Sequence, residues 1–480
     1  MISVDDITAI NTRLAAALAP ATVWVHSLNR TGGENLIRIY EGWVKATAAD
    51  GTVSTLPWTI TFNGSDVPDV SVVKGQSSSA AISVPKSHFH AVAPFSESAP
   101  FSNGPLIWGS VWSAESSFCG VKLILENYDT QNPLVITGLY VAAQANADKT
   151  ALPMRDASNG SSWLPVSYQG APITNLSIPP AIADKQGSIL ITDTVYVRSV
   201  PRIDGSPQCL LNVQVKSTNA SGVVSRTIYG SLNGGDMKGF NDAINRKFAS
   251  YTLASGDVGQ SHIEDDVTLA NNSPVRGAIF ISPNPGYTLL TPGDSLWCGA
   301  YGSPEGYQST GLYAAEALST DTTPVGFVGT AWGGMDTTTF FANGRRMFDA
   351  VNPKLVIMPC GSPNDNGGPM DIHAQLTEAL EFYEYCTSRG ALVVMSTAFP
   401  WSVQGAVSIY QTAELSAAVR ALGIPTLDAE FLLSGVIPTP GTQTTVLDKY
   451  RGADGVHLND DGYKMLGTEA AKILRKLAGL

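Results

Sequence analysis

The chain has 480 residues, of which 44% are hydrophobic and 15% charged, so it is long enough to bury a large core in several domains. Its formal net charge of −12 argues against a nucleic-acid or anionic-membrane partner, because both require a basic surface. The sequence also lacks an apolar run of the roughly 18 residues that span a bilayer. The composition therefore favours a globular protein that acts on a neutral molecule.

The first twenty residues predict a helix and contain no lysine or arginine before Arg13. They lack the basic segment that begins a signal peptide, which leaves cytoplasmic, phage-borne and extracellular locations open. The five cysteines are far apart and show no CxxC spacing, so a zinc or redox site is not expected. We expect mostly free thiols, with at most one disulfide, between Cys119 and Cys209.

The segment 21–285 is rich in Ser, Thr, Asn, Gly and Val, and it contains short alternating runs between turn residues. This pattern predicts antiparallel β-structure. The clearest of these runs are 22–27, 194–200 and 211–217.

A cluster of Pro, Ser and Gly at 94–105 has no periodicity and indicates a boundary. We therefore expect an N-terminal helix and small β module over 1–95. A larger β-sandwich, jelly-roll-like accessory domain is expected over 96–284.

After residue 285 the pattern changes to strands that alternate with helices. Alternation of this kind predicts parallel strands joined by crossover helices, hence a three-layer α/β sheet over 285–480. In such sheets the active site lies at the carboxyl ends of the strands. The predicted elements after the first strand are a strand at 354–361, a helix at 371–389 capped by Asp371, a strand at 391–397, a helix around 412–423, a strand at 424–428 and a last helix at 462–477.

Polar residues with catalytic potential follow these strands. Gly293-Asp294-Ser295 comes directly after the first strand, and a glycine pair, Gly333-Gly334, follows the next one. The segment 361–365 contains Asn364, and the last loop contains Asp454-x-x-His457. Because strand ends of a parallel sheet meet at one edge, we expect these four segments to form one site.

The residue types fit acyl transfer. A serine hydroxyl is a weak nucleophile that needs a base, which His457 can supply for Ser295. Asp454 can hold the imidazole in the required tautomer. The backbone N–H groups of Ser295 and Gly334 and the side-chain amide of Asn364 are the expected oxyanion donors.

These segments, in this order, resemble the four blocks of the SGNH (GDSL) hydrolase family over roughly residues 285–480. The resemblance implies a flavodoxin-like fold and hydrolysis of esters without a metal or organic cofactor. It assigns Ser295 as nucleophile, His457 as base, Asp454 as its orienting group and Asn364 as an oxyanion donor. The glycine block has one residue more than the usual form, so Gly333 is an alternative to Gly334. The β-rich half resembles the accessory domains of some bacterial and phage members.

Other polar residues near these blocks have structural interpretations. We expect Asp294 to hold the turn before the nucleophile and Asp365 to belong to a turn or hydrogen-bond network. His373 is expected on a solvated helix face, and Cys298 is expected to pack under the turn. His88 and His90 would share one face of a strand, but no further metal ligand lies near them in the sequence, so no metal site is expected.

Tryptophans beside the blocks bear on the substrate. Trp297, Trp332 and Trp401 are either sugar-stacking rings or core residues. Trp108, Trp112 and Trp163 of the β-rich half have the same two interpretations. We expect an esterase that removes O-acetyl groups from a carbohydrate, with a short-chain carboxylesterase as the alternative. A glycan-binding or phage-tail structural module with a hydrolase fold is the alternative from another class.

Overall fold

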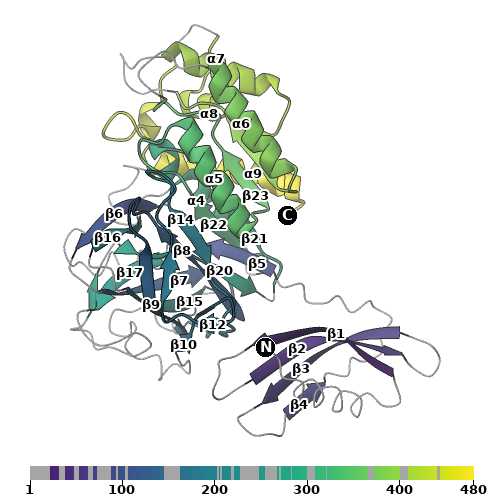
Figure 1. Cartoon of the computed structure of the whole chain (residues 1–480). Helices are drawn as coiled ribbons and strands as arrows, with labels where there is room; N and C mark the ends of the chain where they lie inside the picture. Colours follow the sequence, from purple (N-terminus) through teal and green to yellow (C-terminus); the bar gives the residue numbers. More distant parts are fainter. Residues whose placement is uncertain are drawn as a thin grey trace. The chain divides into compact units, whose positions relative to one another are not determined.

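Figure 1 shows the computed structural model of the chain, which divides into two compact units, Met1–Lys86 and Ser87–Leu480. Among the described residues no helix has the length and apolar character needed to cross a membrane. The structure describes residues 22–31, 38–47, 53–62, 69–72, 88–92, 96–102, 106–144, 163–202, 205, 208–217, 221–227, 248–253, 267–269, 272–282, 284–299, 309–320, 322–365, 372–400, 409–439 and 444–480.

The first unit contains a four-stranded antiparallel sheet in the order β1-β2-β3-β4. Each strand pairs with the next along the chain, as in a β-meander. These strands lie in the segment for which a small β module was expected, whereas the expected N-terminal helix lies outside the described residues. The strands are β1 (Thr22–Thr31), β2 (Arg38–Thr47), β3 (Val53–Phe62) and β4 (Asp69–Val72).

Two larger antiparallel sheets belong to the second unit. One has the order β10-β9-β15-β7-β17-β18 with β13 paired to β9, and the other has the order β19-β16-β8-β20-β5 with β14 on β8 and β6 on β16. The strands are β5 (His88–Val92), β6 (Ser96–Ser102), β7 (Leu106–Ala114), β8 (Gly120–Asn127), β9 (Leu134–Gln144), β10 (Leu164–Pro165), β13 (Leu176–Ile178), β14 (Ser188–Ile191), β15 (Cys209–Ser217), β16 (Ser221–Thr227), β17 (Phe248–Leu253), β18 (Val267–Leu269), β19 (Asn272–Ser273) and β20 (Val275–Ser282). A short separate pair joins β11 (Ser167–Tyr168) to β12 (Ala171–Pro172).

The two sheets share one hydrophobic core, to which Trp112 and Leu123 contribute from opposite sheets. Side chains alternate across a strand, so Ile124, next to Leu123, lies on the other face of β8. There it belongs to a second core, together with residues such as Phe341 of the α/β part. The sheet that contains β8 is therefore buried on both faces, which joins the β-rich and α/β parts into one unit.

The α/β part is built on a parallel sheet in the order β22-β21-β23-β24-β25. Numbered along the chain this order is 2-1-3-4-5, the order of flavodoxin-like doubly wound sheets. The direction of winding changes between β21 and β23, where such folds have their binding crevice. The strands are β21 (Tyr287–Thr291), β22 (Val325–Gly329), β23 (Leu355–Met358), β24 (Leu392–Ser396) and β25 (Thr426–Leu427).

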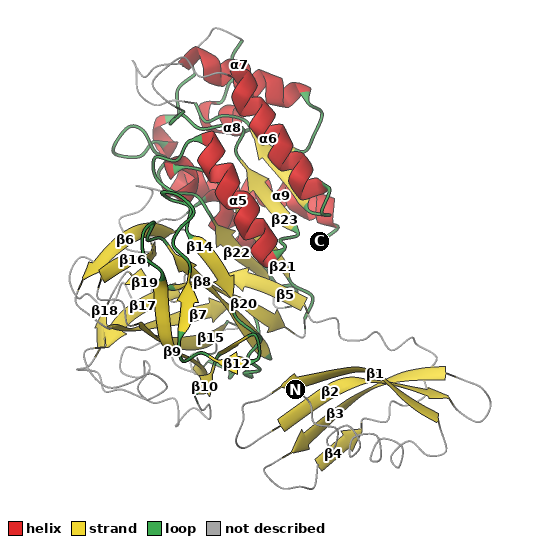
Figure 2. Cartoon of the chain, in the orientation of Figure 1, coloured by secondary structure: helices red, strands yellow, loops and turns green. Residues whose placement is uncertain are grey.

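Helices cover both faces of this sheet. In Figure 2, α5 and α6 cover the near face. One core joins the sheet to α4, α8 and α9, and the other joins it to α5, α6 and α7. Alternate strand residues face the two cores: Leu289 contributes to the first and Leu290 to the second. The helices are α3 (Ser295–Cys298), α4 (Thr310–Leu318), α5 (Thr337–Val351), α6 (Ile372–Thr387), α7 (Ile409–Ala421), α8 (Ala429–Ser434) and α9 (Asp460–Ala478), with a 3₁₀ turn at Asp448–Tyr450.

The predicted three-layer α/β sheet is confirmed, and the predicted strands and helices after residue 354 are all present. The expected cap residue Asp371 lies outside the described residues. The expected β-sandwich topology of 96–284 stays a prediction. The domain division at residue 285 also stays a prediction, and the residues on both sides of it belong to one compact unit.

Two details differ from expectation. The segment 94–105 was expected to be a boundary, but β6 lies within it and pairs with β16, and the first unit ends at Lys86. The alternating run 194–200 forms no strand; only Val195 makes an isolated bridge, to Val121. Mostly thiols with at most one disulfide, between Cys119 and Cys209, were expected; no disulfide joins these two cysteines, of which Cys119 is exposed and Cys209 buried.

Candidate active site

The candidate segments that contain Ser295 and Asn364 come from adjacent strands. β21 pairs with both β22 and β23, so the residues that follow β21 and β23 meet at the carboxyl edge where the winding changes. Ser295 follows β21, and Asn364 follows β23. The fold therefore brings the predicted nucleophile and the predicted amide donor to the same crevice.

The turn that presents Ser295 is tightly built. Gly293 has a φ of 149°, and a side chain there would collide with Trp297, so glycine is required. Asp294 caps the short helix α3, because its Oδ1 accepts from the Leu296 N–H at 2.9 Å. Ser295 is then the first residue of the helix and is partly buried. Cys298 packs beneath the turn and donates to the Ser295 carbonyl at 3.3 Å, as expected.

The loop before α9 pairs the two other predicted catalytic residues. Asp454 Oδ2 lies 2.5 Å from His457 Nδ1. Asp454 Oδ1 accepts the backbone N–H groups of Val456 at 3.1 Å and His457 at 3.0 Å. Burial opposes the charge on Asp454, but the hydrogen bonds from His457 and these N–H groups together lower its pKa. The carboxylate therefore stays ionised beside an imidazole that is only 9% exposed.

The glycine segment forms a turn closed by a hydrogen bond from Met335 N–H to the Trp332 carbonyl at 3.3 Å. Gly334 occupies the third position with a φ of 70°, as a type II turn requires, and it is exposed. Asp336 then caps α5 by accepting from Thr339 N–H at 2.7 Å. The central amide of this turn belongs to Gly334 rather than Gly333.

Ser362 links these segments, and it was not recognised in the sequence. Its hydroxyl lies 2.6 Å from Asp294 Oδ2 and 2.8 Å from the Met335 carbonyl. The Asn364 side-chain amide donates to the same Met335 carbonyl at 3.0 Å and to the Ser362 hydroxyl at 3.2 Å. Asn364 is thus joined to both the nucleophile turn and the glycine turn through one buried serine.

Asp294 is the most buried charged group at this site, with 1% of its surface exposed. Burial raises its pKa to about 6, against the opposing effects of the Ser362 and Leu296 hydrogen bonds and of His457. His457 is therefore within electrostatic reach of the residue that precedes Ser295. The expectation that Asp294 holds the turn agrees with these contacts.

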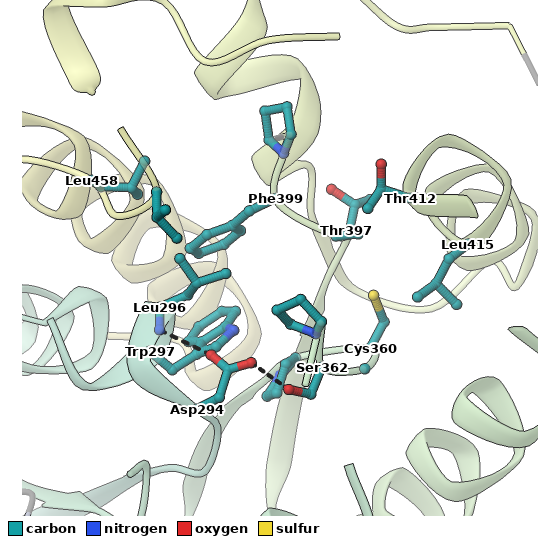
Figure 3. Close-up of a pocket in the computed structure, with 16 residues that line it drawn as sticks. Asp294, Leu296, Trp297, Cys360, Ser362, Thr397, Phe399, Thr412, Leu415 and Leu458 are labelled. Carbon is teal, nitrogen blue, oxygen red and sulfur yellow. Dashed lines mark hydrogen bonds between the residues drawn. The ribbon is translucent and has the colours of Figure 1, made fainter. Parts of the chain in front are cut away.

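A cavity of about 30 Å³ adjoins the site (Figure 3). Figure 3 shows the Asp294 carboxyl directed at Ser362, with Trp297 and Phe399 packed together on another wall, their ring centroids 5.2 Å apart. The cavity is lined by the immediate neighbours of Ser295 and His457, rather than by these two residues themselves: Asp294, Leu296, Val456 and Leu458.

The remaining polar candidates have structural roles or lie elsewhere. Asp365 accepts from the N–H and hydroxyl of Thr337 at 2.8 and 2.7 Å, so it belongs to a network at the start of α5, as expected. His373 is exposed on α6, also as expected. The side chains of His88 and His90 lie outside the described residues, and within the described part of the chain no group of three metal-binding side chains occurs.

The tryptophans beside the site are packing residues. Trp297 and Trp332 are 3% and 7% exposed, and Trp332 packs edge-on against Tyr128 with ring centroids 5.3 Å apart. Trp108 and Trp112 are buried in the core between the antiparallel sheets. Rings with this little exposure cannot stack on a sugar, while Trp401 lies outside the described residues.

Comparisons with known proteins give a limited result. No family model and no curated protein matches the chain. Among solved structures, it is similar to a GDSL-like lipase from Bacteroides thetaiotaomicron, with 16% identity over 40% of this chain and 89% of that one, and a TM-score of 0.31. A lipase/acylhydrolase from Enterococcus faecalis matches at 18% identity, 40% and 96% coverage, and a TM-score of 0.30. The psychrotrophic esterase EstA from Pseudoalteromonas sp. matches at 12% identity, 40% and 100% coverage, and a TM-score of 0.31. These similarities are too weak to assign the chain to a family.

Proposed function

We propose that the chain is a serine hydrolase of carboxylic esters. In this proposal Ser295 is the nucleophile, His457 the general base and Asp454 the group that orients the imidazole. The observation that carries the proposal is the 2.5 Å contact between Asp454 Oδ2 and His457 Nδ1, next to the cavity that also adjoins Ser295.

The reaction proceeds in two acyl-transfer steps. The Ser295 hydroxyl attacks the ester carbonyl while His457 takes its proton, and the oxyanion accepts hydrogen bonds from the N–H groups of Ser295 and Gly334 and from the Asn364 amide. The alcohol leaves with the proton from His457. A water molecule, deprotonated by the same imidazole, then attacks the acyl-enzyme and releases the acid and free Ser295.

The acyl group is proposed to be short. Side chains such as Leu296, Phe399 and Leu458 make the adjoining cavity largely apolar, and Trp297 packed on Phe399 forms one of its walls. An acetyl group suits such a space better than a long chain does, because each further methylene needs apolar volume of its own.

For the alcohol we propose a carbohydrate hydroxyl. Support comes from the exposed polar groups around the site, the Gly334 turn and Asn364, and not from Trp297 and Trp332, which are packed. The packing of Trp297 and Trp332 supports a short-chain carboxylesterase of broad specificity as the second candidate, because these two rings cannot stack on a sugar.

Covalent labelling tests the proposal directly. A fluorophosphonate probe reacts with a serine only when a neighbouring base activates it, so we expect one probe adduct, on the peptide that contains Ser295. Ser295→Ala and His457→Ala should both remain unlabelled, while Ser388→Ala, at an exposed serine after α6, should label like wild type. Labelling that persists in Ser295→Ala, or a folded wild type that does not react, would refute the proposal and favour a binding or structural module.

A further inference from the structure

Lys185 connects the β-rich part of the chain to the candidate active site. It lies in the turn between β13 and β14, and its Nζ donates to the Gly334 carbonyl at 3.3 Å. Its own carbonyl accepts from Asn343 Nδ2, on α5, at 2.8 Å. Both the backbone and the side-chain end of this lysine are therefore attached to the α/β part.

The backbone of Lys185 is held in an unfavourable conformation. Its φ is 58°, in the left-handed region that glycine and asparagine tolerate and that a long side chain disfavours. The surrounding turn is closed by hydrogen bonds from Gln186 N–H to the Ala183 carbonyl and from Ile182 N–H to the Gln186 carbonyl, both at 3.0 Å. Strain of this kind persists where the surrounding contacts compensate for it, and here those contacts direct the side chain to the Gly334 turn.

The Gly334 turn is held at its last residue, where the Met335 carbonyl lies within hydrogen-bond distance of Ser362 and Asn364, but its two central glycines have few restraints. Gly333 and Gly334 are adjacent, and glycine restricts the backbone less than any other residue. The closing hydrogen bond from Met335 to Trp332 is long, at 3.3 Å. A Cβ placed on Gly334 would have only Lys185 Nζ within 4 Å, at 3.6 Å, so this lysine borders the exposed side of the glycine.

We propose that Lys185 is a positioning residue for the oxyanion site. Its ammonium holds the Gly334 carbonyl and thereby fixes the orientation of the turn whose N–H donates to the oxyanion. This inference rests on the proposed function. Donors accelerate acyl transfer when they are already oriented before the negative charge develops, and a tether on a two-glycine turn supplies that orientation. The β-rich part then contributes to catalysis through the turn between β13 and β14 that contains Lys185.

The test separates orientation from general stability. Asparagine tolerates the left-handed backbone, so Lys185→Asn removes the ammonium without lowering the unfolding temperature. With p-nitrophenyl acetate we expect kcat to fall about tenfold and KM to change less than about twofold, a smaller loss than outright removal of an oxyanion donor causes. Lys185→Arg keeps a cationic donor and should recover most of kcat. Lys122→Met, at a partly buried lysine of β8, is the matched control and should leave kcat unchanged.

Each other result overturns the inference. An active wild type whose kcat is unaffected by Lys185→Asn overturns the inference alone. An effect of Lys185→Asn that is mainly an increase in KM also overturns it, because it would mean that Lys185 contacts the substrate. If Lys185→Asn lowers both kcat and the unfolding temperature, and Lys185→Arg does not recover kcat, the role of Lys185 is structural. A wild type no faster than Ser295→Ala overturns the proposed function, and the inference falls with it.

Discussion

His457 Nδ1 and Asp454 Oδ2 lie 2.5 Å apart, and the other carboxylate oxygen of Asp454 accepts two backbone N–H groups of the same loop. The carboxylate is thus fixed on both oxygens before it orients the ring. An Nδ1–H that donates to Asp454 leaves Nε2 as the basic nitrogen of the neutral imidazole. This is the tautomer that a general base for Ser295 needs.

Replacing Asp454 by Asn tests that arrangement. The amide oxygen can still accept the backbone N–H groups, so the fold should persist, but an amide NH₂ facing Nδ1 favours the wrong tautomer. We expect kcat to fall by about 10⁴-fold with little change in KM. Steady-state kinetics on p-nitrophenyl acetate, together with the unfolding temperature, measure both effects. A variant within tenfold of wild type would contradict the role of Asp454.

Asn364 is expected to act through its amide N–H, exchanging one of its hydrogen bonds, to the Met335 carbonyl or to the Ser362 hydroxyl, for one to the oxyanion. Asn364→Asp keeps the shape and removes the donor, so kcat should fall by about 10²–10³-fold while KM changes little. Asn364 is exposed, so the protein should still fold, but the substitution also removes the hydrogen bonds to the Met335 carbonyl and the Ser362 hydroxyl, and the unfolding temperature is measured beside kcat. Thr338→Ala, at an exposed residue of α5, is a suitable control. An equal loss in both variants would show that the effect is not specific to the oxyanion donor.

The raised pKa of the Asp294 carboxyl predicts that the stability of the fold depends on pH. Its pKa is raised by burial from 3.8 to about 6, so the unfolded chain loses this proton first as the pH rises. Native stability therefore decreases between about pH 4 and pH 6, and the loss persists at higher pH. Asp294→Asn removes this cost. The difference in free energy of unfolding between Asp294→Asn and wild type should therefore rise in favour of the variant from about pH 4 to pH 6. The expected rise is on the order of 3 kcal/mol, for a pKa shift of about two units.

Urea unfolding at pH 4, 5, 6 and 7 measures this difference. Asp448→Asn removes one charge at a side chain that is 93% exposed and serves as the matched control. A stability difference between Asp294→Asn and wild type that does not vary with pH would contradict the buried-carboxyl account.

Ile124 tests whether the β-rich and α/β parts unfold together. It is fully buried in the core that also contains Phe341 and Val328. Ile124→Ala should cost about 2–5 kcal/mol. In hydrogen exchange, amides of β15 and of β23 should lose protection by similar factors. Loss of protection in β15 alone would show that the two parts are separate folding units.

The parts of the fold that could be predicted are those with strong local patterns. The apolar runs of β23 and β24 and the periodic helix α9 agree with their predicted positions. β6 was missed because its Ser- and Pro-rich composition resembles a linker, whereas its pairing with β16 uses backbone groups that composition does not report. The run at 194–200 was assigned wrongly because alternation alone does not supply a partner strand.

The same distinction applies to the site. Ser295, Asn364, Asp454 and His457 were identified from short motifs, and their catalytic roles stay predictions. Ser362 and Lys185 were missed, because their partners, Asp294 and Gly334, lie 68 and 149 residues away in the sequence. No local pattern marks a residue that acts through a distant contact.

The most direct measurement is ester hydrolysis by wild type and by Ser295→Ala, with p-nitrophenyl acetate and an acetylated xylan as substrates. The account predicts that wild type releases acetate from both and that Ser295→Ala, folded and equally stable, releases none above background. Hydrolysis of the small ester alone would favour the broad carboxylesterase. Equal rates for the folded wild type and Ser295→Ala would contradict the assignment of Ser295 as the nucleophile.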